Sequence, residues 1–306
     1  MLPTITIRHL TRKEIDIEKW NGCISKASNG LIYAYSYYLD ALCTHWDALV
    51  VNDYEMVMPL PWRRKWGFYY LYQPFFIPAL GVFGNDLSPS IIKTCLDSIP
   101  KKISYWDIDM NEKNEVSSSG KVKVKHRTNL FLTLNQPYEI QSRNYKRLAK
   151  RKLQTALENG LTTQRNVNPE IIIDAYEKHY EDKQRIIPLE AYTQLVQVIN
   201  SLPKKNYQAY LVKKQEEILA FYLILIDERN VYSLIGGSTE EGKEYGAFYL
   251  ATDAVIQDYS NSEKTFRFEG SDIEGIAFFD LQFGSFAVTY PHLQMNNLPW
   301  PLRYLK

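Results

Sequence analysis

The stretch FRFEGSDIEGIAFFDLQFGS, which runs from Phe266 to Ser285, decides how this chain of 306 residues is interpreted. Apolar and charged residues alternate at its start, so we expect a strand over 265–269. A Gly-Ser turn follows, and the apolar spacing after the turn predicts a short helix over 275–283. A last strand is expected over 286–290. The stretch therefore predicts a strand, a polar turn and a helix in succession.

The rest of the second half continues this change between helical and extended periodicity. Gly160 ends its longest helical pattern, and prolines start the next two helices. We expect a helix over 138–159, a strand over 161–166, helices over 169–182 and 188–201, strands over 207–213, 218–226 and 231–235, and a helix over 246–259. After the opening helix, the order is β-α-α-β-β-β-α-β-α-β.

The first half begins with the same order of elements. We expect a strand over 4–9, helices over 13–27 and 32–43, strands over 46–51, 55–60 and 68–72, a helix over 88–98, and strands over 103–109 and 122–134. The three strands between residues 46 and 72 fit one antiparallel meander. We therefore predict an α+β fold of two tandem domains, residues 1–135 and 136–306, each a mixed, mostly antiparallel sheet flanked by helices.

Composition indicates a folded protein without a dominant charge. Hydrophobic residues make up 45% and charged residues 23% of the chain, close to globular averages. The net charge of +1 gives no reason to expect a nucleic-acid coat, and DNA is not an expected partner. The N-terminus lacks a signal-peptide pattern, and no window approaches about 18 apolar residues. We expect a cytoplasmic protein with no membrane span.

The cysteines and histidines show no metal-binding pattern. Cys23, Cys43 and Cys95 are odd in number and form no CxxC pair, so we expect reduced thiols rather than disulfides or a zinc site. The histidines have no HxxxH or HExxH spacing. We therefore expect no metal site and no Ser-His or Cys-His triad.

Three stretches resemble the FemAB/FemX-like tandem GNAT transferases, and the expected order of elements is that of the GNAT acyltransferase fold. The stretch from Phe266 to Ser285 is similar to that family's late strand, Gly-Ser turn and aromatic helix. The run YSLIGGS, residues 232–238, with Gly246 and Ala247 after it, resembles the strand, loop and helix that hold CoA in GNAT enzymes. The basic segment SRNYKRLAKRKLQTALENGL, residues 142–161, resembles the helix that opens the family's second domain.

The resemblance implies a bacterial N-acyltransferase with no covalently bound cofactor. An acyl group would pass from acyl-CoA, as co-substrate, to an amine by direct attack. The second domain would carry the donor site, because a helix N-terminus with glycine lets a phosphate approach the backbone. The implied donor-binding residues are Ile235, Gly236, Gly237, Ser238, Lys243, Gly246 and Ala247. Backbone N–H groups near residues 235–237 would hold the oxyanion.

Catalysis would need a base, because the attacking amine must be neutral. Glu269, directly before the Gly-Ser turn, is the first candidate for this general base, and Asp272 is the second. Tyr232 and Tyr249 are candidates to protonate the leaving thiolate. Each also has an ordinary interpretation, as an exposed carboxylate or as one of many packing tyrosines.

Charge separates along the chain and suggests where substrates bind. Residues 120–152 are rich in Lys and Arg and suit a phosphorylated molecule, whereas residues 240–280 are rich in acids and suit an amine. We expect a small-molecule amine or a nucleotide-linked acceptor as the partner. Candidate substrate-binding residues are Tyr72, Gln73, Arg147, Arg151, Arg267 and Ser271. The alternatives are a solvated helix face and an amphipathic hairpin around residues 62–74.

Two other functions stay open. The same fold could use aminoacyl-tRNA to add amino acids to a cell-wall precursor, as FemX-like proteins do, although the long helical arm of some relatives is missing and tRNA is the less favoured partner. A non-catalytic binding module is the third hypothesis. It is motivated by Asp280, where many relatives carry lysine, and by a degenerate phosphate loop at residues 243–248.

Overall fold

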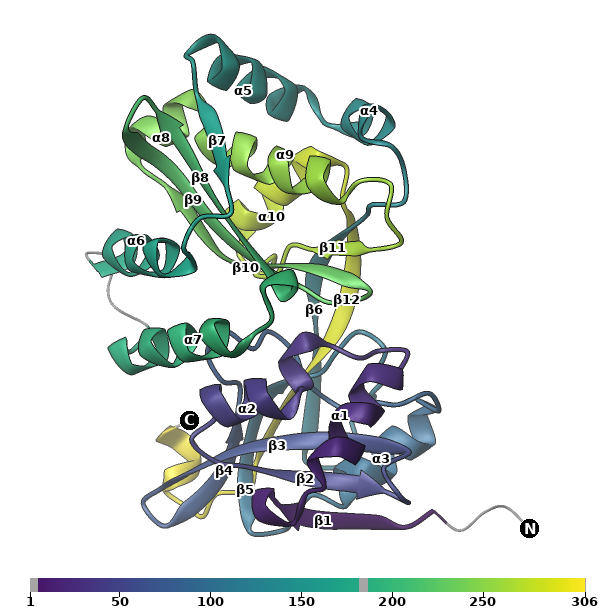
Figure 1. Ribbon diagram of the computed structural model, residues 1–306. Coiled ribbons are helices and arrows are strands. Elements are labelled where there is room, and N and C mark those ends of the chain that lie inside the picture. The colour runs from purple at the N-terminus through teal and green to yellow at the C-terminus, as the bar shows by residue number, and fades with distance from the viewer. Residues whose placement is uncertain (1–4, 182–186, 306) are drawn as a thin grey trace. The chain divides into compact units, whose positions relative to one another are not determined.

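The computed structural model describes residues 5–181 and 187–305 of the chain (Figure 1). The chain forms two compact units, one of Met1–Arg127 with Thr289–Lys306 and the other of Thr128–Val288. Strands β6 (Val122–Thr133) and β12 (Phe286–Asn296) each contribute residues to both units. The linear division at residue 135 rests on element order alone and stays a prediction.

The first unit is a mixed sheet with three α-helices among its described residues. Its strands β1 to β4 form an antiparallel series, β4 and β5 run parallel, and β5 pairs antiparallel with β12. The expected meander between residues 46 and 72 is therefore confirmed. The elements are β1 (Ile7–Thr11), α1 (Ile17–Lys26), α2 (Ser36–Leu42), β2 (Trp46–Val51), β3 (Met56–Lys65), β4 (Phe68–Tyr72), α3 (Pro89–Asp97) and β5 (Ile103–Asp109).

Apolar periodicity builds the first unit's core. Helix α3 buries Ile92 and Cys95 against strand residues such as Met58 and Trp106. Helix α1 begins at residue 17, later than expected, because the Asp16 side chain caps the N–H groups of Glu18 and Lys19.

The second unit is also a mixed sheet, so the expected fold class is confirmed. Strand β6 is followed across the sheet by β11, β10, β9, β8 and β7; of the described pairs among these strands, β10 with β11 is parallel and the others are antiparallel. The elements are α4 (Tyr138–Gln141), α5 (Arg147–Glu158), β7 (Thr162–Arg165), α6 (Pro169–Glu181), α7 (Leu189–Ser201), β8 (Tyr207–Lys214), β9 (Glu217–Ile226), β10 (Asn230–Ser238), α8 (Glu240–Tyr245), α9 (Ala247–Tyr259), β11 (Thr265–Arg267) and α10 (Glu274–Asp280).

The single helix expected over residues 138–159 is wrong, because Tyr145 interrupts it. Tyr145 has an extended backbone (φ −63°, ψ 138°), so α4 and a short 3-10 turn end before it and α5 begins after it. Its hydroxyl donates to Asp253 on α9 at 2.8 Å, and its ring packs on Phe283. A buried hydrogen bond and ring packing therefore outweigh the helical pattern of the sequence.

The described residues contain no helix that is both long and apolar enough to cross a membrane. Cys23, Cys43 and Cys95 are buried free thiols. Burial raises the pKa of both the Cys23 and the Cys95 thiol to about 11, so neither side chain is a thiolate near neutral pH.

Candidate functional site

Strands β10 and β11 separate at the point where the candidate residues lie. They pair in parallel only from Asn230 to Tyr232 on β10, whereas β10 continues along β9 to Ser238. On its other side β11 pairs antiparallel with β6, and Arg267 lies opposite Phe131. The chain that leaves β11 after Arg267 therefore enters a strand end bordered by β6 and β10, a usual place for chemistry.

Glu269 has a backbone conformation that residues with a side chain rarely adopt. Its φ is +56°, and that of Gly270 is +71°. Such a conformation costs of the order of 1 kcal/mol and persists only where neighbours hold it. Asn129 on β6 does so: its Oδ1 accepts from the Glu269 N–H at 3.1 Å, and its Nδ2 donates to Glu269 Oε2 at 2.6 Å. The Asn129 amide thus fixes both the backbone and the carboxylate.

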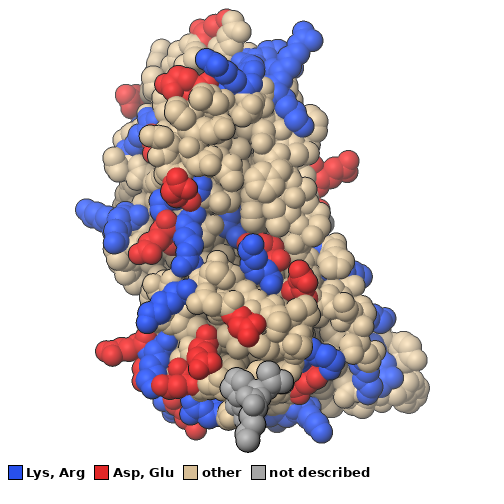
Figure 2. All heavy atoms as spheres, turned by 90° about the vertical axis from the view of Figure 1, so that its right-hand side faces the viewer, with Lys and Arg blue, Asp and Glu red and all other residues tan. Residues whose placement is uncertain are grey.

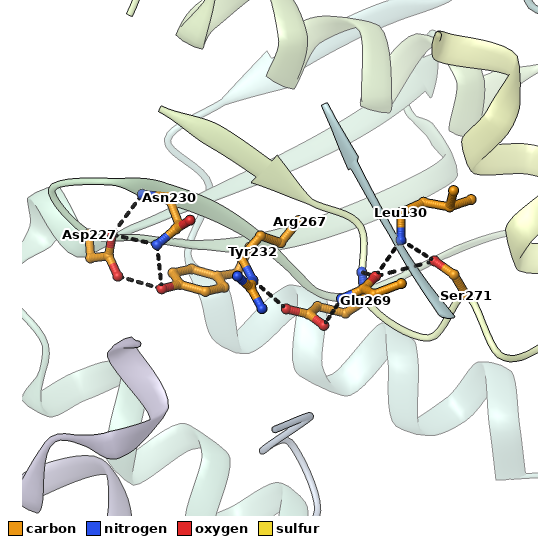
Figure 3. A network of polar contacts seen from close by, with 8 residues as sticks. Leu130, Asp227, Asn230, Tyr232, Arg267, Glu269 and Ser271 are labelled. Carbon is orange, nitrogen blue, oxygen red and sulfur yellow. Dashed lines mark hydrogen bonds and ion pairs between the residues drawn. The ribbon is translucent and has the colours of Figure 1, made fainter. Parts of the chain in front are cut away.

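The Glu269 carboxylate also forms a buried ion pair with Arg267 (Figure 3). Arg267 Nε donates to Glu269 Oε1 at 3.3 Å, and the two side chains are only 5% and 10% exposed. The guanidinium lies 4.3 Å from the centre of the Phe131 ring and 5.9 Å from that of Tyr232. A charge pair with so little exposure is held in one orientation, so Arg267 positions Glu269.

Ser271 and Asp280 extend this network. The Ser271 hydroxyl lies 3.3 Å from Asn129 Oδ1 and 3.2 Å from Asp280 Oδ2, and it accepts from the Leu130 N–H at 3.2 Å. Asp280 ends α10 and is 3% exposed. Burial raises the pKa of Asp280 to about 8; the Ser271 hydrogen bond opposes this rise, and the charge of Glu269 adds to it. Asp280 is therefore mainly protonated at neutral pH.

The structure does not give Tyr232 a free hydroxyl. Its ring is fully buried, its hydroxyl donates to Asp227 at 2.5 Å, and Asn230 Nδ2 donates to that hydroxyl at 3.0 Å (Figure 3). Tyr249 is half-buried against Phe279 on α10 at 4.7 Å, and burial raises the pKa of its phenol.

Asp272, the second candidate base, is exposed, and its Oδ1 accepts from the Thr128 N–H at 3.1 Å. The structure therefore brings Arg267, Glu269 and Ser271 into one network, while Tyr249 belongs to the aromatic core cluster.

The loop expected to bind the donor, between β10 and α9, is packed against other parts of the protein. Helix α8 comes between β10 and α9, and Gly246 joins the two helices with φ +77°. A Cβ on Gly246 would lie 2.6 Å from the Lys152 carbonyl of α5, and Lys152 Nζ donates to the carbonyls of Lys243 and Glu244. Lys243 itself pairs with Glu240. Glycine at this position lets two helices approach, and its role in phosphate binding stays a prediction.

The β10 glycines also contact the protein's own rings. A Cβ on Gly236 would lie 2.7 Å from both Phe248 and Tyr222, and one on Gly237 would lie 2.9 Å from Phe221. The other three expected donor residues on β10 and α9 are buried: Ile235, Ser238 and Ala247.

Five cations of the basic segment are exposed. They lie on α5 and directly before it, and none forms an ion pair within residues 5–181 and 187–305: Arg143, Lys146, Arg147, Lys150 and Arg151. Figure 2 shows Lys and Arg side chains gathered near the top of the view, at the height where Figure 1 draws α5. This basic face suits an anionic partner.

Tyr72 and Gln73 belong to the first unit. The Arg63 guanidinium lies over the Tyr72 ring at 4.2 Å. Gln73 accepts from the Asp109 N–H at 2.9 Å and donates to the Ile77 carbonyl. Gln73 therefore ties two backbone segments together.

Sequence reasoning did not select Asn129, Asp227 or Asn230, and it regarded Asp280 only as a missing lysine. Asn129 stands directly before the apolar run LFL, and Asp280 interrupts the apolar run IAFFDLQF. A polar residue within an apolar run or directly beside one is the signal that could have marked both, since such residues need a buried partner.

Comparison by sequence finds no match to any protein-family model or curated protein. By structure the chain is similar to FemX, with a TM-score of 0.67 and 12% identity over 97% of this chain and 99% of FemX. It is similar to L-PGS from Bacillus licheniformis (TM-score 0.53, 11% identity, 95% of each chain). A tandem GNAT protein from the clavulanic acid biosynthesis pathway gives a TM-score of 0.54 and 10% identity over 97% of this chain and 99% of that protein. The chain therefore has the FemX-like tandem GNAT fold.

Proposed function

We propose that the protein is an acyltransferase that transfers an acyl group to an amine by direct attack. The network at the end of β11 is the observation that carries this proposal. It connects an ion-paired carboxylate, Glu269, through Asn129 and Ser271 to a neutral carboxyl, Asp280. Paired carboxyl groups in different protonation states are the arrangement that general acid and base catalysis requires. The acyltransferase fold supports the reaction class.

In the proposed reaction the amine nitrogen forms a bond with the acyl carbon, and the bond from that carbon to the leaving group breaks. Glu269 accepts the proton that the amine loses, directly or through water. The leaving thiolate or alkoxide receives a proton from Asp280, relayed by Ser271. Arg267 acts through Glu269, because its guanidinium forms an ion pair with that carboxylate and orients it.

Acyl-CoA is the first donor that we propose. A thioester has a good leaving group and suits direct transfer without a covalent enzyme intermediate. Two features disfavour binding of the CoA phosphates at the loop around Gly246. The backbone of α5 packs directly against Gly246, and the first turn of α8 carries two acids, Glu240 and Glu241. Acyl-CoA binding would then use cations elsewhere, and the face with Arg147 and Arg151 is available.

Aminoacyl-tRNA is the second candidate donor, with a nucleotide-linked cell-wall precursor as acceptor. The exposed cations on α5 favour it, because adjacent Arg and Lys side chains without acidic partners match a phosphate backbone. Similarity to FemX in fold is consistent with this candidate.

Direct assay separates the two donors. The purified protein is mixed with an amine panel and either radiolabelled acetyl-CoA or aminoacyl-tRNA, and amine-dependent product is measured. Transfer from tRNA should fall steeply between about 50 and 200 mM salt, since several phosphate contacts release counterions, whereas transfer from CoA should change little. Absence of transfer from both donors would contradict the proposal and favour a binding module.

Replacing the proposed base tests the site itself. Glu269→Gln should lower kcat by about 10²- to 10⁴-fold, the usual contribution of a general base, with little change in KM. Glu274→Gln is the matched control, because Glu274 is an exposed acid in the first turn of α10. Equal turnover of the two variants would remove Glu269 from the mechanism.

A further inference from the structure

A pocket of about 480 Å³ lies in the first unit, and its lining includes no residue of the proposed site. Residues of β5, of β12 and of the start of β6 supply most of its wall, and Arg303 in the short 3-10 helix at Leu302–Leu305 supplies the rest. Its lining includes Tyr105, Lys121, Lys123, Gln294, Asn296 and Arg303. Pockets of this size commonly hold small molecules.

Strand alternation explains why polar groups share this wall. Val122 and Val124 pack on the first unit's core, so Lys121 and Lys123 face the other side of the sheet. On the neighbouring pair of strands, Asn296 lies directly opposite Tyr105. Most of the pocket wall is thus a face of the sheet, and the strand residues in it are held by backbone pairing.

The charge of the pocket is positive. Lys121, Lys123 and Arg303 form no ion pair with any residue that the structure describes. Lys121 Nζ donates to the neutral amide of Asn297 at 2.6 Å. The acid beside the wall is Asp107, which accepts from the Tyr105 hydroxyl at 3.0 Å and lies 3.4 Å from His292 Nε2.

We propose that this pocket binds a small phosphorylated organic molecule. Three cations in the lining match a phosphate or diphosphate group, because Lys and Arg supply charge-assisted hydrogen bonds to phosphate oxygens. The amide of Gln294 supplies a donor and an acceptor for a polar organic part. The Asn296 amide instead holds the pocket's edge, because it donates to the Arg303 carbonyl and accepts from the Leu298 N–H. Since every lining residue belongs to the first unit, the proposal does not rest on the proposed transferase activity.

Calorimetric titration of the full chain tests the proposal, with ADP and inorganic pyrophosphate as separate probes at 20 and 200 mM salt. We expect saturable binding of ADP at one site that weakens with salt. The double variant K121Q/K123Q should bind ADP at least tenfold more weakly. The control Lys125→Gln should bind like the wild type, because Lys125 is an exposed cation on the same strand outside the pocket lining.

Each other outcome overturns a defined part of the proposal. Absence of saturable binding to either probe, or an equal loss in the Lys125→Gln control, would exclude the pocket as a phosphate site. Binding of pyrophosphate without ADP would assign it to an inorganic anion. Tighter binding of a single-stranded oligonucleotide than of ADP, lost in K121Q/K123Q, would show that the surface takes a polymer. Thermal melting of each variant verifies that it is folded.

Discussion

The Asp280 carboxyl contributes to stability only while it keeps its proton. Its pKa rises from the ordinary value near 3.8 to about 8 on folding, chiefly because it is buried. The pKa of Asp280 is higher in the folded than in the unfolded protein. Its contribution to the free energy of unfolding is therefore complete below the unfolded-state pKa and is lost as the pH increases toward 8.

Asp280→Asn should remove this pH dependence, because the amide stays neutral. Between pH 5 and pH 8 the free energy of unfolding of the wild type should fall relative to the variant, by at most about 1.4 kcal/mol for each pH unit. Urea unfolding at pH 5, 6.5 and 8 measures the difference. Parallel stability curves for the two proteins would show that Asp280 is ionised throughout.

Gly246 gives a second prediction at the scale of one residue. Gly246→Ala should lower the free energy of unfolding by at least about 2 kcal/mol more than Gly160→Ala, since added atoms at buried contacts force backbone shifts. Both glycines have positive φ, but nothing lies within 4 Å of a Cβ on Gly160, whereas one on Gly246 meets the Lys152 carbonyl. Chemical unfolding of both variants compares them. Equal costs would indicate an open space at Gly246, as a phosphate site requires.

The break between α4 and α5 depends on a buried carboxylate that accepts from two phenols. Tyr145 and Tyr138 donate to Asp253 at 2.8 and 2.9 Å. Burial raises the pKa of Asp253, and both hydrogen bonds oppose that rise. The three side chains therefore fix the position where the basic helix begins.

Tyr145→Phe should lower the free energy of unfolding by about 1–3 kcal/mol, because it leaves a buried carboxylate with one donor fewer. Tyr249→Phe should cost less than about 0.5 kcal/mol, since its hydroxyl makes no hydrogen bond with a described residue. Urea denaturation measures both changes. Similar costs for the two variants would contradict a special role for the Asp253 hydrogen bonds.

Periodicity in the sequence was sufficient to predict most helices and strands, but it did not reveal all of them. The strands expected over 46–51, 68–72 and 103–109 match β2, β4 and β5 residue for residue. Helix α8 was not expected, because its six residues EEGKEY contain almost no apolar periodicity and depend on the Thr239 cap.

The same contrast holds for the candidate site. Glu269, Arg267 and Ser271 could be selected because they are close together in the sequence and flank a strand end. Asn129 could not be selected from the sequence, because it lies 140 positions from Glu269. Their contact follows from the register between β6 and β11. The alternation within each strand shows which side chains share a face, but it does not show which residue of a strand so distant in the sequence lies opposite.

At the scale of the whole molecule, the C-terminal residues complete the first unit. Leu293 of β12 pairs with Ile108 and joins the first unit's core, and His292 Nδ1 lies 2.9 Å from Asp109 Oδ1. These contacts connect residues 289–306 to a sheet that is otherwise built near the start of the chain.

Deletion of residues 289–306 should destabilise the first unit by more than about 3 kcal/mol and the second unit much less, because β5 loses a partner strand. The six tryptophans all lie in the first unit, and the deletion removes only Trp300, so five of them remain in both proteins: Trp20, Trp46, Trp62, Trp66 and Trp106. Their fluorescence reports that unit alone, whereas far-ultraviolet circular dichroism reports both. The fluorescence transition in urea should move further than the dichroism transition. Equal movement of both would show that the units unfold together.

The pairing of β12 with β5 also sets an order for events during synthesis. A ribosome releases residues 128–288 before residues 289–306, so strands β6 to β11 are all available while β5 still lacks its last neighbour. Until then β5 presents unpaired backbone groups beside Tyr105 and Trp106, a surface on which nascent chains associate. The half of the protein that is translated first is therefore the half that finishes folding last.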